Sequence, residues 1–291
     1  MPIQGLQGKD FFIDMYIDHD PSTGIKDAFC GDKTYNGHKG TDFTLRSFKT
    51  MDSGIYVHAI ADGVVLAASD GEFDRNTDWL KTGMGNFILI LHEGRYRTFY
   101  GHLMKNSSKV HLGDSVKKGQ VLAKVGSSGY SKGPHLHLEI YDILLMDKLV
   151  DPFAGPCQVN NSSLWEYQPI YDTASYPIED GFTPYIPRLD SLKMRWFVSD
   201  TIYANKDTVA CHWILMHGLR KQDIVKTEWL DRNGKIKMQY SDTVKENEWF
   251  TYHWNYVLMP VRPGMYLVRC FVNDKLVAIR NCYIKIYEEE Q

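Results

Sequence analysis

Two short motifs in this chain carry residue types that bind metal ions. They are His38-x-x-x-Asp42 and, far downstream, His135-x-His137, with His102 between them. Imidazole nitrogens and carboxylate oxygens are common ligands of mononuclear zinc sites. A catalytic zinc site uses three protein ligands and leaves the fourth position open, whereas a structural site is closed by four ligands. The motifs therefore predict a catalytic metal site with histidine partners.

The spacing within each motif favours extended backbone, because residues two apart on a strand share one face. His135 and His137 would then point the same way, while the apolar residues between and after them face a core. If the first motif is also extended, His38 and Asp42 share a face, and Gly40 has no side chain to separate them. One histidine of the second motif would complete a set of three ligands.

The cysteines do not suggest a thiolate metal site. The chain has five cysteines and no Cys-x-x-Cys pair. Cys30 and Cys157 lie at the two ends of the first predicted domain and would pair if the protein is exported. Two buried free thiols are an equally good interpretation.

Length and composition limit the classes of protein to consider. A chain of 291 residues, 43% of them hydrophobic, is long enough for two domains that each bury a core. A net charge of −3 offers no basic surface for nucleic acid. No apolar run is long enough to cross a bilayer, so no transmembrane segment is expected. The first residues lack a basic-then-apolar pattern, so no signal peptide is visible.

Residues 1–155 are predicted to form an all-β domain, since no long apolar period of 3.6 residues occurs there. Turn residues between apolar runs predict one hairpin over 57–68, around Asp62-Gly63, and another over 86–102, around Glu93-Gly94. The Ser- and Gly-rich segment 127–134 leads into the second histidine motif. It is expected to be a flexible loop, either the rim of a substrate cleft or a plain connector.

The rest of the chain predicts a linker and a second β domain. Six prolines fall between residues 152 and 190, so residues 156–188 are predicted to be a Pro-rich linker. Short alternating strands return over residues 189–291, a pattern typical of an immunoglobulin-like β-sandwich. No motif assigns a role to this domain, and packing or binding to a polymer are both compatible with its aromatic residues.

The first domain resembles the M23 metallopeptidases, the lysostaphin- and LytM-like zinc endopeptidases. The resemblance covers roughly residues 30–153, and its motifs occur in the family's order. They are His38-x-x-x-Asp42, Ala61-Asp62-Gly63-Val64-Val65, Gly85-Asn86, Gly101-His102-Leu103, Gly113-Asp114-x-Val116, Lys118-Gly119-Gln120, Gly126-x-x-Gly129, His135-x-His137 and Asp151-Pro152. The resemblance implies an all-β fold, with a LytM-type β-sheet or half-barrel catalytic domain before the immunoglobulin-like β-sandwich.

The resemblance also implies a role for each residue of the two motifs. One Zn²⁺ per chain would be held by His38, Asp42 and His137, while His102 and His135 would transfer protons around the reacting water. A neutral imidazole can take the proton of such a water and pass it to the leaving amine.

Members of this family cut peptide bonds in bacterial cell-wall peptidoglycan, and many are exported. The resemblance therefore implies a zinc metalloendopeptidase with a peptidoglycan peptide or a related peptide as substrate, in the periplasm or cell envelope. The family also uses an upstream tyrosine near the oxyanion that develops during hydrolysis. Tyr35 is the candidate for that residue here.

The motifs of the first domain allow two other interpretations. A non-catalytic M23-like scaffold would bind and activate cell-wall hydrolases, but such proteins typically lose a metal ligand and this chain loses none. The segment from Gly113 to Gln120 also resembles the hairpin of biotinyl and lipoyl carrier domains. A carrier domain needs a lysine at an exposed hairpin tip and has no use for the histidines. The presence of the histidine set therefore disfavours that class.

Overall fold

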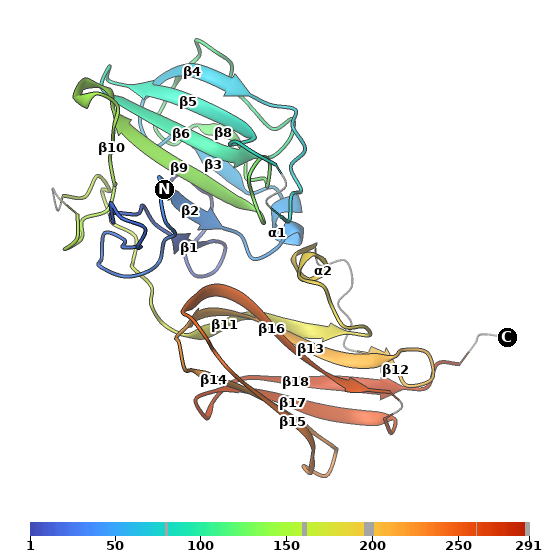
Figure 1. The fold of residues 1–291 in the computed structure, drawn as a ribbon. Coiled ribbons are helices and arrows are strands. Elements are labelled where there is room, and N and C mark those ends of the chain that lie inside the picture. Colours follow the sequence, from blue (N-terminus) through green and yellow to red (C-terminus); the bar gives the residue numbers. More distant parts are fainter. Residues whose placement is uncertain (79–80, 159–161, 195–200, 260, 289–291) are drawn as a thin grey trace. The chain divides into compact units, whose positions relative to one another are not determined.

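The computed structural model describes residues 1–78, 81–158, 162–194, 201–259 and 261–288. The chain divides into two compact units, Met1–Tyr171 and Asp172–Gln291 (Figure 1). The regular secondary structure of both units is almost all β-strand, so the predicted all-β class is confirmed. The helices of the described residues are one or two turns long, and none of them has the length and apolar character needed to cross a membrane.

The first unit contains an eight-stranded sheet in the order β1-β2-β9-β6-β5-β4-β7, with β10 paired to β9. A second, two-stranded sheet is formed by β3 and β8. The strands are β1 (Phe12–Met15), β2 (Thr41–Thr44), β3 (Tyr56–His58), β4 (Gly63–Ser69), β5 (Asn86–His92), β6 (Tyr96–Leu103), β7 (Ser115–Val116), β8 (Val121–Lys124), β9 (His135–Asp142) and β10 (Lys148–Leu149). The short helices are α1 (Phe48–Asp52) and the 3₁₀ helix η1 (Ile143–Leu145).

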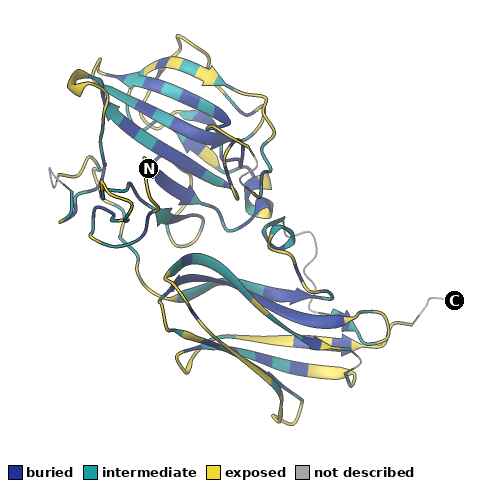
Figure 2. Cartoon of the chain, viewed as in Figure 1, coloured by how far each residue is buried: buried dark blue, intermediate teal, exposed yellow. Residues whose placement is uncertain are grey.

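The hairpin predicted over residues 86–102 is confirmed as β5 and β6. Glu93 and Gly94 connect the strands with φ angles of 49° and 65°. Positive φ at both central residues is what a type I′ turn requires, and this turn matches the twist of antiparallel strands. Buried and half-buried residues alternate along β5, as the bands in Figure 2 show. The local sequence therefore specifies both the turn and the buried face.

The hairpin predicted over residues 57–68 is wrong. β3 pairs with β8, whereas β4 pairs with β5 and β7. Gly63 does not adopt the positive φ that the tight turn would need. The Asp62 carboxylate instead accepts hydrogen bonds from the Lys118 backbone N–H and the Lys117 ammonium, both at 2.8 Å. Asp62 thus fixes the segment between β7 and β8 rather than a turn of its own.

The central strand β9 supplies both core residues and the second histidine motif. Leu136, Leu138 and Ile140 are buried, as the alternation predicts. β9 is hydrogen-bonded to β2 on one side and to β6 on the other. Residues on β9 are therefore held in register by two neighbouring strands.

Cys30 and Cys157 form a disulfide, with their Cα atoms 5.2 Å apart. Of the two interpretations of these cysteines, a disulfide or two free thiols, the structure has the disulfide. The bond joins positions separated by 127 residues, so it ties the start of the first unit to the segment after β10. The other three cysteines, Cys211, Cys270 and Cys282, are buried and reduced.

The second unit is a β-sandwich of a three-stranded sheet, β11-β13-β16, and a five-stranded sheet, β12-β18-β17-β14-β15. Its core takes Phe182, Ala210 and Val257 from one sheet and Trp229 and Val268 from the other. Its elements are β11 (Tyr176–Thr183), α2 (Leu189–Met194), β12 (Thr201–Tyr203), β13 (Val209–Leu219), β14 (Ile224–Leu230), β15 (Ile236–Thr243), β16 (Glu248–Leu258), β17 (Gly264–Val272) and β18 (Lys275–Lys285).

The second unit begins earlier than the sequence predicted. Strand β11 lies inside the predicted linker 156–188 and pairs with β13 along its whole length. Pro177 does not prevent this pairing, because β11 is an edge strand and its register shifts between Pro177 and Glu179. Prolines there mark an edge strand, and the linker ends near Asp172.

Replacing both Cys30 and Cys157 by serine should lower the free energy of unfolding by about 2–5 kcal/mol, because the cross-link restricts the unfolded chain. Denaturant unfolding of the purified variant checks this value. Wild-type protein unfolded with a reductant is the control and should show the same loss. If the reductant leaves wild-type stability unchanged, the two thiols are not paired in solution.

Candidate metal centre

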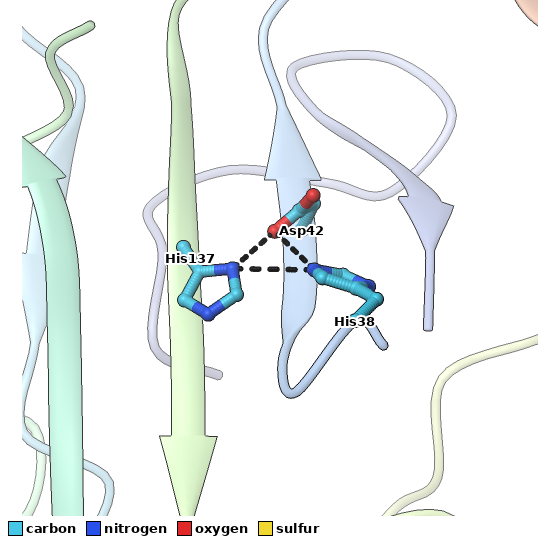
Figure 3. Close-up of side chains that lie close together, drawn as sticks. All are labelled: His38, Asp42 and His137. Carbon is cyan, nitrogen blue, oxygen red and sulfur yellow. Dashed lines mark hydrogen bonds and ion pairs between the residues drawn. The ribbon is translucent and has the colours of Figure 1, made fainter. Parts of the chain in front are cut away.

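The pairing of β2 with β9 places Asp42 directly opposite His137. On the other side of β9, Gly101 of β6 pairs with the same histidine. His38 precedes β2, and its ring reaches the pair because its Nδ1–H donates to the Tyr16 carbonyl at 2.7 Å. Figure 3 shows the three side chains directed toward one another from the two strands and the preceding loop.

Three donor atoms of these residues form a small, closed triangle. His38 Nε2 lies 3.3 Å from His137 Nδ1 and 3.3 Å from Asp42 Oδ1, and the last two atoms are 2.7 Å apart. Tetrahedral zinc with bonds of about 2.0–2.1 Å separates its ligand atoms by roughly 3.3 Å. All three residues are buried. Their donor atoms lie close enough together to hold a metal ion. The donor set fits zinc, and two of the three separations match this value, while the third is shortened by the hydrogen bond between His137 and Asp42.

Gly40 allows this approach, although the segment is not extended as predicted, since β2 begins only at Thr41. A Cβ atom on Gly40 would lie 2.5 Å from His137 Cε1 and 2.6 Å from His137 Nε2. These separations are shorter than carbon and nitrogen atoms tolerate. As expected, position 40 has no side chain to separate His38 from Asp42. The His137 ring occupies the space that a Cβ atom on Gly40 would need.

Each of the four histidines has one ring nitrogen bonded to an acceptor outside the centre. His38 and His102 donate from Nδ1 to the carbonyls of Tyr16 and Ser128, both at 2.7 Å. His135 Nδ1 donates to the Gly133 carbonyl at 2.9 Å. Because a carbonyl only accepts, these three Nδ1 atoms carry the proton and Nε2 is left as an acceptor.

In His137 the outer nitrogen is Nε2 rather than Nδ1, and its acceptor is Glu139, a residue that the sequence motifs did not single out. Its Nε2–H donates to Glu139 Oε1 at 3.1 Å, so Nδ1 is the nitrogen that faces Asp42 and His38. Glu139 in turn accepts the Tyr141 hydroxyl at 2.9 Å. A period of two along β9 places Glu139 on the face of His137, and this signal was present in the sequence.

His102 and His135 lie beside the three candidate ligands. Their ring centroids are 4.6 Å apart, and His135 Nε2 is 3.9 Å from Asp42 Oδ1. His102 has a φ angle of 59°, a left-handed backbone conformation that a histidine adopts only when its surroundings hold it there. The two histidines of the predicted catalytic pair are therefore brought to one place, next to the candidate metal ligands.

The Ser- and Gly-rich segment 127–134 is held in place by hydrogen bonds of its buried serine side chains, so the expectation of a flexible loop is wrong. Ser127, Ser128 and Ser131 are buried. Ser127 Oγ donates to the Asn76 carbonyl, and Ser128 Oγ donates to the Leu103 carbonyl. The carbonyls that orient His102 and His135 belong to this segment, so its hydrogen bonds fix both rings.

Burial and charge set the protonation of the centre. Although burial acts to raise it, the neighbouring imidazoles of His38, His135 and His137 hold the pKa of Asp42 well below its usual range. Burial lowers the pKa of both His102 and His135, so both rings are neutral near pH 7. Burial opposes protonation of His137 too, but Asp42 and Glu139 outweigh it and raise the pKa to about 9.

Tyr35 lies against His38 and is partly exposed. Its ring stacks on that of His38 with centroids 4.4 Å apart, and 47% of the residue is exposed. Burial, followed by the charge of Asp42, raises the pKa of the phenol. The hydroxyl therefore stays protonated and able to donate a hydrogen bond.

The fold and the centre define a β-sheet protein with a buried His-Asp-His site flanked by two neutral histidines. Residues 36–152 match peptidase family M23. This part of the chain is therefore a peptidase family M23 domain, which confirms the resemblance. The match does not extend to the second unit.

Three similar proteins have names that describe their activity. "Glycyl-glycine endopeptidase ALE-1" of Staphylococcus capitis is 40% identical over 103 residues, 35% of this chain and 24% of that protein. "Peptidoglycan DD-endopeptidase ShyC" of Vibrio cholerae is 34% identical over 102 residues, 35% of this chain and 19% of that protein. The solved catalytic domain of lysostaphin from Staphylococcus simulans is 27% identical, with a TM-score of 0.31, covering 50% of this chain and 85% of that one. The chain thus spans about a quarter or less of the two curated relatives.

Gly40→Ala should disturb the centre without touching a ligand atom. The added methyl group overlaps the His137 ring, so we expect a loss of about 1–3 kcal/mol in stability and weaker zinc binding. Competition with a chelator measures the zinc affinity. Gly24→Ala is the matched control, because the methyl group there meets the side-chain ends of Asp20 and Ser22, which lie outside the centre. Equal zinc affinity in the two variants would contradict the assigned role of Gly40.

Proposed function

We propose that this protein is a zinc-dependent endopeptidase that hydrolyses peptide bonds in bacterial cell-wall peptidoglycan. The observation that carries the proposal is the set of four oriented histidines around Asp42. His38, Asp42 and His137 would hold one zinc ion per chain. Two imidazole nitrogens and one carboxylate oxygen are a donor set that zinc uses in hydrolases with an open coordination position. Both similar proteins are named as endopeptidases, and the name of the Vibrio cholerae protein supports peptidoglycan as the substrate class.

When bound, zinc supplies a Lewis acid that polarises a carbonyl group and makes water more acidic. The chain's own residues supply the proton transfers. His102 and His135 are neutral and keep Nε2 as an acceptor, so either ring can take a proton from the attacking water and return it to the leaving amine. Tyr35 keeps its hydroxyl proton and can donate to the oxyanion of the scissile carbonyl.

The scaffold alternative receives no support from the residues of the centre. A protein that only binds and activates other hydrolases has no need of oriented proton acceptors beside a metal site. Here the three candidate ligands and both flanking histidines are present, and carbonyl or carboxylate acceptors orient all four rings. The arrangement favours catalysis.

The proposed location is the cell envelope or periplasm, where peptidoglycan lies. The disulfide between Cys30 and Cys157 supports this proposal, because such bonds persist in oxidising compartments and are rare in the cytosol.

Substitutions should separate the metal ligands from the proton-transfer residues. His137→Ala should lose zinc, measured by elemental analysis of purified protein. His102→Ala should keep about one zinc per chain and lose on the order of 10²-fold or more in kcat, since it removes only an acid–base group. His111→Ala, an exposed histidine, is the control and should match wild type. Zinc retained at full occupancy in His137→Ala would reject the ligand assignment.

The substrate is tested by incubating the zinc-loaded protein with peptidoglycans of different cross-bridge types. Mass spectrometry then identifies new peptide termini, and a chelator should abolish them. Substrates with glycine cross-bridges and with direct cross-links distinguish the two bond types named for the similar proteins. Zinc binding without cleavage of any peptidoglycan would favour the scaffold alternative over the peptidase.

A further inference from the structure

The His137 ring is held between two carboxylates, unlike the other three rings. Its Nδ1 lies 2.7 Å from Asp42 Oδ1, and its Nε2 donates to Glu139 Oε1 at 3.1 Å. His38, the other histidine of the triangle, uses an uncharged carbonyl of Tyr16 for its outer nitrogen. The candidate ligand His137 therefore has a charged acceptor on the side away from the centre.

Glu139 is itself fixed in place. Its Oε2 accepts the Tyr141 hydroxyl at 2.9 Å, which leaves Oε1 to face the histidine. The side chain is mostly buried between these partners, with 15% of its surface exposed. The guanidinium of Arg97 lies over the Tyr141 ring, 5.1 Å from its centroid. His137, Glu139 and Tyr141 follow one another at every second position of β9, so one strand face carries the whole chain of contacts.

The position of Glu139 excludes it from direct contact with a metal held by the triangle. It bonds Nε2, whereas Nδ1 belongs to the triangle, so the imidazole ring separates the carboxylate from the centre. Carboxylates that accept the outer N–H of a metal-binding histidine fix its orientation and increase the basicity of the ligating nitrogen. Glu139 has the contacts needed for that role.

We propose that Glu139 is a positioning residue for zinc, which holds His137 with Nδ1 toward the metal, and that Tyr141 positions Glu139. The inference rests on the proposed function, because it assumes that the triangle binds zinc. It adds two residues that act through His137 and touch neither the metal nor the substrate. A carboxylate here has a further consequence: the negative charge on the outer side of the ring stabilises positive charge at the centre.

The experiment compares Glu139→Ala, Glu139→Gln and Tyr141→Phe in the full chain. Glu166→Gln is the matched control, because Glu166 is an exposed carboxylate paired with Lys118. The first measurement is the zinc dissociation constant, by competition with a chromophoric chelator at fixed pH. The second is NMR of ¹⁵N-histidine-labelled, zinc-loaded protein, in which a slowly exchanging Nε2 proton of His137 reports the hydrogen bond to Glu139.

We expect Glu139→Ala to weaken zinc binding by about 10–100-fold and to lose the protected Nε2 proton. Glu139→Gln keeps the size and an oxygen acceptor but loses the charge, so its loss should be smaller. Tyr141→Phe should weaken binding less than Glu139→Ala, since it removes only the second contact. Glu166→Gln should match wild type in both measurements. If the alanine variant does not fold, the glutamine and phenylalanine variants decide the outcome.

Zinc affinity within about twofold of wild type in folded variants at Glu139, with the protected Nε2 proton retained, would overturn the inference. The experiment does not depend on peptidase activity. If wild type binds zinc but cleaves no peptidoglycan, the proposed function fails, while the loss of affinity at Glu139 still stands. If wild type cleaves peptidoglycan and the Glu139 variants bind zinc as tightly as wild type, the proposed function stands and this inference fails.

Discussion

The antiparallel pairing of β2 with β9 is the constraint on which the centre depends. It sets Asp42 opposite His137, and the neighbouring pairing of β6 brings Gly101 to the other side of the same histidine. A slip of one residue in either pairing would turn one of these side chains to the opposite face of the sheet. The apolar residues of β9 prevent such a slip, because Leu136 and Leu138 would then leave the core. Packing on one face of the sheet thus fixes the geometry of polar groups on the other.

The centre has two halves that are built differently. One half, formed by the candidate metal ligands, relies on charge: Asp42 is held ionised, and His137 lies between it and Glu139. The other half relies on burial and uncharged acceptors, which keep His102 and His135 neutral. A negative group next to His102 would stabilise its protonated form and weaken it as a proton acceptor. The carbonyls of the segment 127–134 orient the rings without introducing such a charge.

The sequence predicted what local patterns encode. The turn at Glu93-Gly94 and the alternation along β9 depend on neighbours within a few residues. Local spacing left open which histidine of the second motif joins His38 and Asp42, and only the resemblance to the M23 metallopeptidases singled out His137. The hairpin at Asp62-Gly63 was wrong because partners distant in sequence compete for those strands. The linker was misjudged because a proline on an edge strand removes no hydrogen bond that the sheet needs. Backbone carbonyls that orient the histidines have no sequence signature, so only the fold places them.

Three of the four rings take their orientation from main-chain oxygen atoms. Point mutation cannot delete a main-chain oxygen. Side chains near these rings can therefore be exchanged, in evolution or in protein engineering, without removing these acceptors, as long as the path of the backbone is kept. Insertions or deletions in segment 127–134 would move two of these oxygen atoms, so they would disturb the rings of His102 and His135 more than an exchange of side chains would. The orientation of His102 and His135 is thus inherited with the shape of the loop.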